Sequence, residues 1–100
     1  MRYTKIKWIH DFPREPVWIY EEIDENGWEQ RKIEVFPDGS LGRADKREEV
    51  GGTRLAIQEK IPSLLEIGSD PQFEGNEISA EEFEAAWSKA VIEGRDIANG

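Results

Sequence analysis

Hydrophobic and polar positions alternate along the first third of the chain, which is the pattern of half-buried β-strands. In residues 3–10, Ile6 and Trp8 occupy one side of a predicted strand, and Lys5 and Lys7 occupy the other. Two prolines follow, and proline cannot donate a hydrogen bond to a neighbouring strand. The pattern therefore predicts a first strand followed by a constrained loop.

A hairpin is predicted next, because two alternating segments, 17–24 and 28–36, flank a short polar loop that ends at Gly27. Gly27 can take the positive φ that closes such a loop. A three-residue loop predicts a register in which three pairs share one face: Val17 with Val35, Ile19 with Ile33, and Glu21 with Arg31. The other face then carries the aromatic residues Trp18, Tyr20 and Trp28.

A two-residue loop would change the partners across this hairpin. It would set Ile19 against Glu34, which mixes apolar and charged residues on one face. It would still pair Glu22 with Arg31. We prefer the three-residue loop because it keeps the face around Ile19 apolar.

Shorter signals predict the other strands and a short helix. A turn at 37–39 predicts a fourth strand at 40–44, and the two glycines before residue 53 predict a loop that leads to a short fifth strand at 53–57. Pro62 can open a short helix near 62–68, and an irregular connection is expected from residue 70 onward.

The last part of the chain predicts a longer helix over residues 80–93. Ser79 is its expected N-cap, with Glu82 three residues later as the partner in a capping box, and Gly94 is its expected end. Apolar residues recur at helical spacing along one side: Phe83, Ala86, Trp87, Ala90 and Val91.

These elements together predict an α+β fold, with an antiparallel four- to five-stranded sheet covered on one face by a C-terminal α-helix. The whole chain, 1–100, is expected to be a single domain, with strands in 3–57, a short helix near 62–68 and the C-terminal helix 80–93. The apolar stripe of that helix needs a sheet face to cover, and the predicted receiver is the surface formed by Val17, Ile19, Ile33 and Val35.

Composition narrows the function classes. The chain has no cysteine, which excludes disulfides and thiolate metal sites, and it has one histidine. It carries 22 acidic and 13 basic residues, for a net charge of −9. Residues 1–60 contribute −2 and residues 61–100 contribute −7, with no Lys or Arg between Lys60 and Lys89.

This charge distribution indicates which partners to expect. Phosphate backbones and anionic lipids attract proteins through Lys and Arg, so we expect neither nucleic acid nor a membrane as partner. A basic protein would be attracted. The chain also shows neither a secretory signal nor an apolar run long enough to cross a bilayer, so we expect it in the cytoplasm.

Catalytic groups are sparse. One hypothesis is a small hydrolase or ligand-binding enzyme that uses His10 with Glu21 or Glu22. The structural alternative makes His10 a strand-end residue that is hydrogen-bonded to backbone beside Trp8, and makes Glu21 the partner of Arg31 in a salt bridge. We favour the structural alternative and assign no catalytic residue, no metal ligand and no cofactor.

Recognition of a partner protein is the other hypothesis. Aromatic residues anchor many protein interfaces, and acidic residues would steer a basic partner toward them. The predicted contact residues are Trp18, Tyr20, Trp28, Glu22, Glu66, Asp70, Glu74 and Glu77. We expect a protein-binding domain, of the immunity or antitoxin type, that neutralises a basic toxin by occluding its active site.

Several segments carry a resemblance that spans nearly the whole chain: 7–10 (KWIH), 15–21 (EPVWIYE), 31–36 (RKIEVF) with 38–39 (DG), 52–55 (GTRL) and 81–87 (EEFEAAW). With these segments the chain resembles a family of small bacterial domains of unknown function. The resemblance implies a bacterial single-domain protein. That family has no assigned activity, so the resemblance implies no catalytic or binding residue.

Overall fold

The computed structural model describes residues 1–99, and the side chains of residues 1–93. Six strands form one antiparallel sheet and two helices accompany it, so the predicted α+β class is confirmed with a slightly higher strand count. The strands are β1 (Arg2–Trp8), β2 (Trp18–Ile23), β3 (Glu29–Val35), β4 (Leu41–Ala44), β5 (Glu49–Val50) and β6 (Phe73–Ile78). The helices are α1 (Leu64–Gly68) and α2 (Ala80–Asn99).

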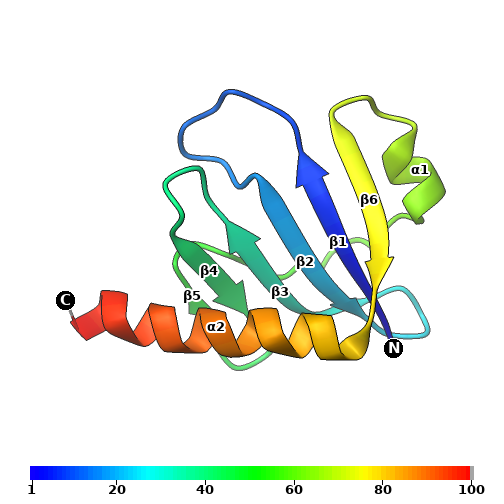
Figure 1. Cartoon of the computed structure of the whole chain (residues 1–100). Helices are drawn as coiled ribbons and strands as arrows, with labels where there is room; N and C mark the ends of the chain where they lie inside the picture. The colour runs from blue at the N-terminus through cyan, green and yellow to red at the C-terminus, as the bar shows by residue number, and fades with distance from the viewer. Residues whose placement is uncertain (100) are drawn as a thin grey trace.

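The strands lie in the order β5-β4-β3-β2-β1-β6. The chain runs as a meander from β1 to β5, passes behind the sheet, forms α1, and returns as β6 on the free side of β1 (Figure 1). It then continues into α2, which lies across the strands on the opposite side (Figure 1). We term the sheet face under α2 the helix face, and the face that carries residues 51–63 and α1 the rear face.

Two of the sequence predictions about strands were wrong. Residues 53–57 are irregular instead of forming a strand, because Gly51 and Gly52 take positive φ values of 73° and 83° and turn the chain out of the sheet after β5. Residues 73–78 form β6 instead of an irregular connection, because they pair with β1 along nearly its whole length. Pairing between distant segments here outweighs the weak strand propensity of a glycine, an asparagine and two glutamates.

The hairpin loop between β2 and β3 is confirmed. Gly27 has a φ of 90°, and the N–H of Asp24 donates to the carbonyl of Trp28 at 2.9 Å. The three residues between Asp24 and Trp28 therefore form the loop.

The register beyond this loop was predicted wrongly, because a β-bulge follows it. Ile23 pairs with Glu29 but Glu22 pairs with Arg31, so Gln30 is an extra residue on β3. The pairing beyond the bulge is shifted by one residue. Two rows of partners result: Ile19 with Glu34 and Glu21 with Lys32 on the rear face, and Trp18 with Val35, Tyr20 with Ile33 and Glu22 with Arg31 on the helix face.

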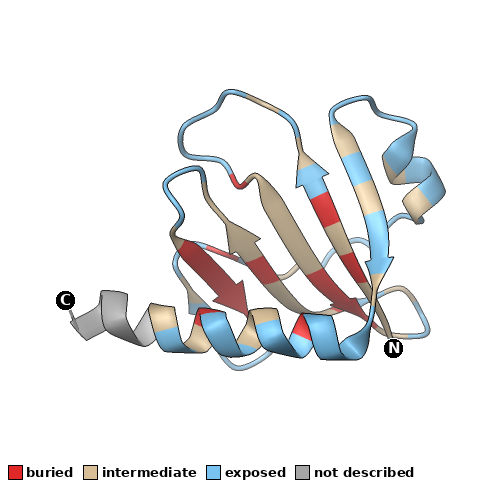
Figure 2. Cartoon of the chain, viewed as in Figure 1, coloured by how far each residue is buried: buried red, intermediate tan, exposed pale blue. Residues whose placement is uncertain are grey.

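This shift changes which residues form the core under α2. Ile19, predicted to receive the helix, lies on the rear face, whereas Tyr20 packs beneath α2. The buried residues of the core are Ile33, Leu41, Phe83 and Ala90, with Tyr3, Tyr20, Val35, Ile78, Ala86 and Trp87 packed around them. Figure 2 shows buried positions both on the strands behind α2 and on the side of α2 that meets them.

The second helix begins where the sequence predicted, and the short helix begins at Leu64, two residues after the predicted opening at Pro62. The Oγ of Ser63 accepts from the N–H of Glu66 at the start of α1, and the Oγ of Ser79 accepts from the N–H of Glu82 at the start of α2. The predicted end of the second helix was wrong, because α2 continues past Gly94 to Asn99. A glycine costs a helix only about 1 kcal/mol relative to alanine, which does not suffice to end it.

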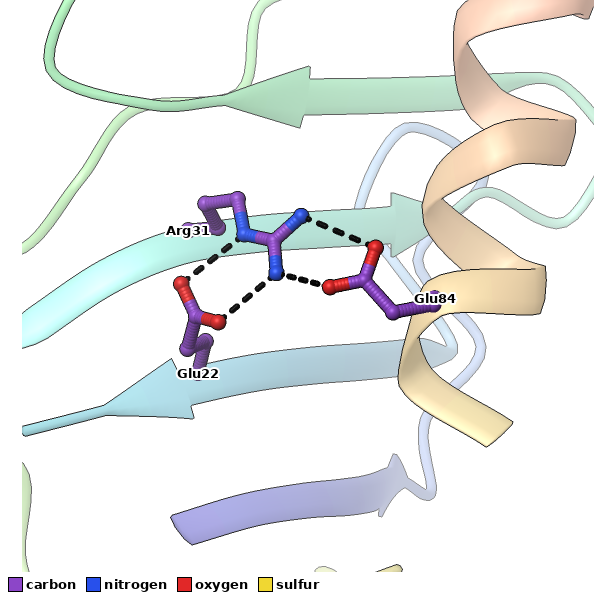
Figure 3. Close-up of polar contacts among 3 residues, drawn as sticks. All are labelled: Glu22, Arg31 and Glu84. Carbon is purple, nitrogen blue, oxygen red and sulfur yellow. Dashed lines mark hydrogen bonds and ion pairs between the residues drawn. The ribbon is translucent and has the colours of Figure 1, made fainter. Parts of the chain in front are cut away.

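Arg31 joins α2 to the sheet (Figure 3). Its Nε and Nη2 donate to the two carboxylate oxygens of Glu22 at 2.8 and 2.7 Å, and its Nη1 and Nη2 also donate to Glu84 on α2. The guanidinium lies 4.8 Å from the ring centroid of Phe83. The predicted pairing of Arg31 with Glu21 was therefore wrong, because the bulge places Glu22 on the side of Arg31.

Replacing Arg31 with Met should lower the free energy of unfolding by about 2 kcal/mol or more, because the Glu22 side chain, only 10% exposed, would lose the cation that compensates its burial. Denaturant unfolding followed by circular dichroism measures this change. The matched control Arg14→Met removes an exposed arginine and should change stability by less than about 0.5 kcal/mol. Equal effects of the two variants would contradict a specific role for Arg31.

Candidate functional site

A cleft of about 420 Å³ opens on the rear face between the sheet and α1. Its residues come from β1, β2, β6, α1 and the segments on either side of α1. Five of them are apolar and two are carboxylates: Ile6, Ile19, Pro62, Ile67 and Phe73, with Glu66 and Asp70. Because both carboxylates are exposed while Ile6 is buried, the cleft has an apolar floor and an acidic edge. We term it the α1 cleft.

The floor of the α1 cleft depends on a close approach of α1 to β6. Ile6 pairs with Ile19 on one side and with Gly75 on the other. A Cβ atom on Gly75 would lie 2.8 Å from Cδ2 of Leu64, which is closer than two non-bonded carbon atoms approach. The missing side chain at Gly75 therefore lets α1 pack against the sheet edge.

Short-range hydrogen bonds hold the backbone at both carboxylates. The N–H of Glu66 donates to the N-cap Ser63 at 3.2 Å, and the Oγ of Ser69 donates to the carbonyl of Glu66 at 2.6 Å. The carboxylate of Asp70 accepts from the N–H of Gln72 at 2.9 Å. These contacts order the acidic edge of the cleft before any partner arrives.

The charge at the α1 cleft is entirely negative. Its lining includes two carboxylates and no basic side chain, and the chain has no Lys or Arg from residue 61 to residue 88. Such an edge attracts cations, and the apolar floor beneath it excludes water from one side of any group bound there.

An aromatic cluster extends the apolar surface of the cleft. Trp8 stacks on Phe73 with 5.8 Å between the ring centroids, and Phe12 lies 6.3 Å from Trp8. Phe12 is 56% exposed and Ile9 is 45% exposed. Apolar surface therefore continues from the α1 cleft into the loop after β1.

The predicted acidic contact residues are divided among several surfaces. Glu66 and Asp70 lie together at the α1 cleft. Glu77 pairs with Thr4 and shares the rear face with the cleft, whereas Glu74 pairs with Lys7 on the opposite face. Glu22 is buried in the ion pair with Arg31.

The predicted aromatic contact residues do not form one row. Trp18 and Tyr20 line a groove of about 510 Å³ between the helix face and α2, and Nζ of Lys5 lies 4.5 Å from the Trp18 ring centroid. Trp28 lies at the hairpin loop, 37% exposed, with Nζ of Lys60 5.9 Å from its ring centroid. Neither group lines the α1 cleft.

The proposed catalytic group of His10 with Glu21 or Glu22 is not assembled. The Nε2–H of His10 donates to the carbonyl of Pro16 at 2.8 Å, and the N–H of Phe12 donates to Nδ1 at 2.9 Å, so both ring nitrogens have partners. Glu21 pairs with Thr4 near the other end of β1, about 20 Å away at the rise of an extended strand. The geometry at His10 is that of the structural alternative, beside Trp8.

Glu21 instead belongs to a buried carboxyl pair. Glu21 is 5% exposed and Glu29 is 4% exposed, and both lie on the rear face, where Nζ of Lys32, the cross-strand partner of Glu21, is 3.1 Å from Oε1 of Glu29. Burial and the neighbouring Glu29 raise the pKa of Glu21 to about 9, against a weaker opposing effect of Lys32. Glu21 therefore keeps its proton at neutral pH. The pair lies under residues 53–57, away from the α1 cleft.

Among the side chains that the structure describes, residues 1–93, no group of three or more acidic or histidine side chains is arranged to hold a metal ion. The two helices within residues 1–99 are too short or too polar to cross a bilayer.

The sequence predictions missed the apolar floor of the α1 cleft. Ile19 was assigned to the face under the C-terminal helix, Ile6 was assigned to neither face of the sheet, and Phe73 was placed in an irregular connection. The one available signal was the presence of two apolar residues, Ile67 and Phe73, on either side of a polar stretch that contains Asp70. That signal does not say which strands would meet them.

The comparisons with known proteins give one finding. The sequence model of a family described as a domain of unknown function (DUF6881) matches residues 2–92. No curated protein and no solved structure matches the chain. The matched region contains all six strands, α1 and the first part of α2, and so includes the whole α1 cleft.

Replacing Gly75 with Ala should lower the free energy of unfolding by about 1 kcal/mol, because Leu64 must shift to make room for the added methyl group. Thermal and denaturant unfolding measure the loss. The control Gly68→Ala adds a methyl group at the end of α1 where nothing lies within 4 Å, and it should leave stability unchanged or slightly higher. A Gly75→Ala protein as stable as this control would contradict the close packing of α1 on β6.

Replacing Glu21 with Gln should remove a pH dependence of stability. Folded protein keeps the Glu21 proton up to about pH 9, whereas the unfolded chain loses it near pH 4.5, so stability falls as pH rises between these values. The limiting slope is about 1.4 kcal/mol per pH unit. Denaturant unfolding at several pH values should therefore show that the free energy of unfolding of the Glu21→Gln protein increases relative to that of the unmodified protein as pH rises. The exposed control Glu25→Gln should show no such gain.

Proposed function

Because the chain belongs to DUF6881, a family of domains of unknown function, we propose a function from the geometry of the α1 cleft: it is a protein-binding domain that receives a basic partner protein. The observation that carries this proposal is the combination of an apolar floor with two carboxylates, Glu66 and Asp70, at one edge. The partner contributes Lys or Arg side chains to this cleft.

Long basic side chains fit both parts of the cleft. Lys and Arg bury an aliphatic stem against apolar surface while their charged heads stay near water. The stem would lie on Ile19, Ile67 and Phe73, and the head would reach Glu66 or Asp70. An arginine head can also bond a carboxylate with two parallel hydrogen bonds, which adds orientation to the attraction.

The exposed aromatic cluster supports a larger contact than one side chain. Phe12 is exposed and lies against Trp8, which in turn stacks on Phe73 in the cleft. Apolar anchors surrounded by charged residues are typical of protein interfaces. The partner surface would therefore cover both the cleft and the loop after β1.

The charge of the C-terminal part supports rapid association. Residues 61–100 carry a net charge of −7, and complementary charge raises the rate at which proteins meet. Salt screens such attraction, so the association rate with a basic partner falls as ionic strength rises.

The more specific form of this proposal is an immunity or antitoxin protein whose partner is a basic toxin. A small acidic domain that covers the active site of a basic enzyme blocks access of its substrate by occlusion. The support is the small size of the chain, its net charge of −9 and the ordered acidic edge of the α1 cleft.

The test is affinity capture from the native host, followed by identification of the captured protein and measurement of its binding. The double variant Glu66→Gln/Asp70→Asn should bind the identified partner about ten- to a hundredfold more weakly, because it loses both carboxylates at the cleft. The control Glu25→Gln/Glu49→Gln removes the same charge from exposed sites away from the cleft and the loop after β1, and it should bind nearly normally.

Two results would contradict the proposal. One is a captured partner that binds both double variants equally well. The other is a partner whose contact surface, once known, is not basic. If the partner is a toxin, its activity should be inhibited by the unmodified chain and much less by the Glu66→Gln/Asp70→Asn variant.

A further inference from the structure

Residues 53–57 lie across the rear face and are held there by polar groups of β3. The Oγ of Thr53 donates to Oε1 of Glu34 at 2.7 Å, and Nζ of Lys32 donates to the carbonyl of Arg54 at 2.9 Å. The N–H of Ala56 donates to Oε1 of Glu29 at 2.8 Å. We term residues 53–57 the strap.

The strap lies close to the sheet beneath it. Thr53 is fully buried, and a Cβ atom on Gly42 would lie 2.0 Å from its Oγ. The strap forms neither helix nor strand, and Ile57 at its end is 76% exposed. Its attachment therefore depends on a few polar contacts and not on regular backbone pairing.

The contact at Ala56 depends on the protonation of a second carboxyl group. Oε1 of Glu29 accepts from Ala56 and lies 3.1 Å from Nζ of Lys32. Oε2 of Glu29 is buried and has no hydrogen-bond partner among the described residues. Glu21 is buried on the same face, and its cross-strand partner Lys32 reaches Glu29; the Glu21 carboxyl can donate to this oxygen only while it carries a proton.

We propose that the strap is closed by a proton shared between Glu21 and Glu29, and that opening the strap releases this proton to the solvent. With the strap closed, the two carboxyl groups, buried beside one lysine, hold one proton between them. With the strap open, water reaches both groups, and each ionises as an ordinary glutamate does. A rise in pH therefore favours the open strap.

The charged groups around the pair set its net charge. Lys32 on β3 and Arg2 on β1 favour ionisation of Glu21, whereas Glu29 on β3 opposes it. Burial opposes ionisation more strongly than any of these charges. Arg54 of the strap contributes its carbonyl oxygen to Lys32, and Glu34 accepts from Thr53 at the far end of the strap.

Opening of the strap would also reach the α1 cleft. Beyond the strap, the N–H of Ile61 donates to the carbonyl of Gly27 at 2.8 Å, and the next residue, Pro62, lines the cleft. A released strap would leave Pro62 less firmly placed, so binding at the cleft should weaken as pH rises. This link to binding rests on the proposed function, whereas proton release by the strap does not.

Hydrogen exchange of the Ala56 amide in the free protein tests the strap directly. Its protection, relative to an unstructured peptide, should fall about tenfold per pH unit between about pH 6 and pH 8, because one proton leaves with each opening. The Ile33 amide in β3 reports on the rest of the sheet and should keep its higher protection. No partner is needed, so failure of this experiment is separate from failure of the proposed function.

Three variants complete the test. Glu21→Gln imitates the protonated carboxyl, so the protection of Ala56 should become independent of pH. Glu29→Gln replaces the acceptor carboxylate by a weaker neutral acceptor, so it should lower Ala56 protection, while the buried Glu21 keeps a pH dependence. The control Glu59→Gln removes an exposed carboxylate just beyond the strap and should behave as the unmodified chain does.

The proposal is overturned by either of two results. One is Ala56 protection that does not change with pH in the unmodified chain. The other is a pH dependence that persists unchanged in the Glu21→Gln protein.

Discussion

One extra residue in β3 determines how the two faces of the sheet are used. The bulge at Gln30 lets the hairpin keep its three-residue loop while the strands beyond it pair one residue out of step. On one side of the bulge, Arg31 faces α2. On the other side, Glu29 faces the strap. Glu21, which precedes Glu22 on β2, lies on this same face.

The bulge also explains why charged residues hold both covering layers. Arg31 fastens α2 through Glu84, and Glu29, Lys32 and Glu34 fasten the strap. Both sets of contacts come from the same strand, and they point to opposite faces because side chains alternate along a strand. A small domain with few large buried side chains gains specificity of packing from such paired polar groups.

The acidic residues of this chain therefore have two distinct uses. Glu21, Glu22 and Glu29 are buried and paired within the fold. Glu66 and Asp70 are exposed beside an apolar floor, where nothing in the described chain neutralises them. The net charge alone does not distinguish these groups, because burial and register decide which carboxylates a partner can reach.

Local chemistry in the sequence by itself determined the strands β1 to β4, the loop that ends at Gly27, the start of α2 and the acidic C-terminal part, because each depends on residues close together in the chain. Only the tertiary structure decided the bulge at Gln30, the pairing of β6 with β1 and the irregular path of the strap. Those features arise from contacts between distant residues: the sequence around Phe73 and Gly75 is a poor strand on its own, and only β1 beside it makes it one. The α1 cleft exists for the same reason, since Ile6, Ile19 and Phe73 meet only after the strands have paired.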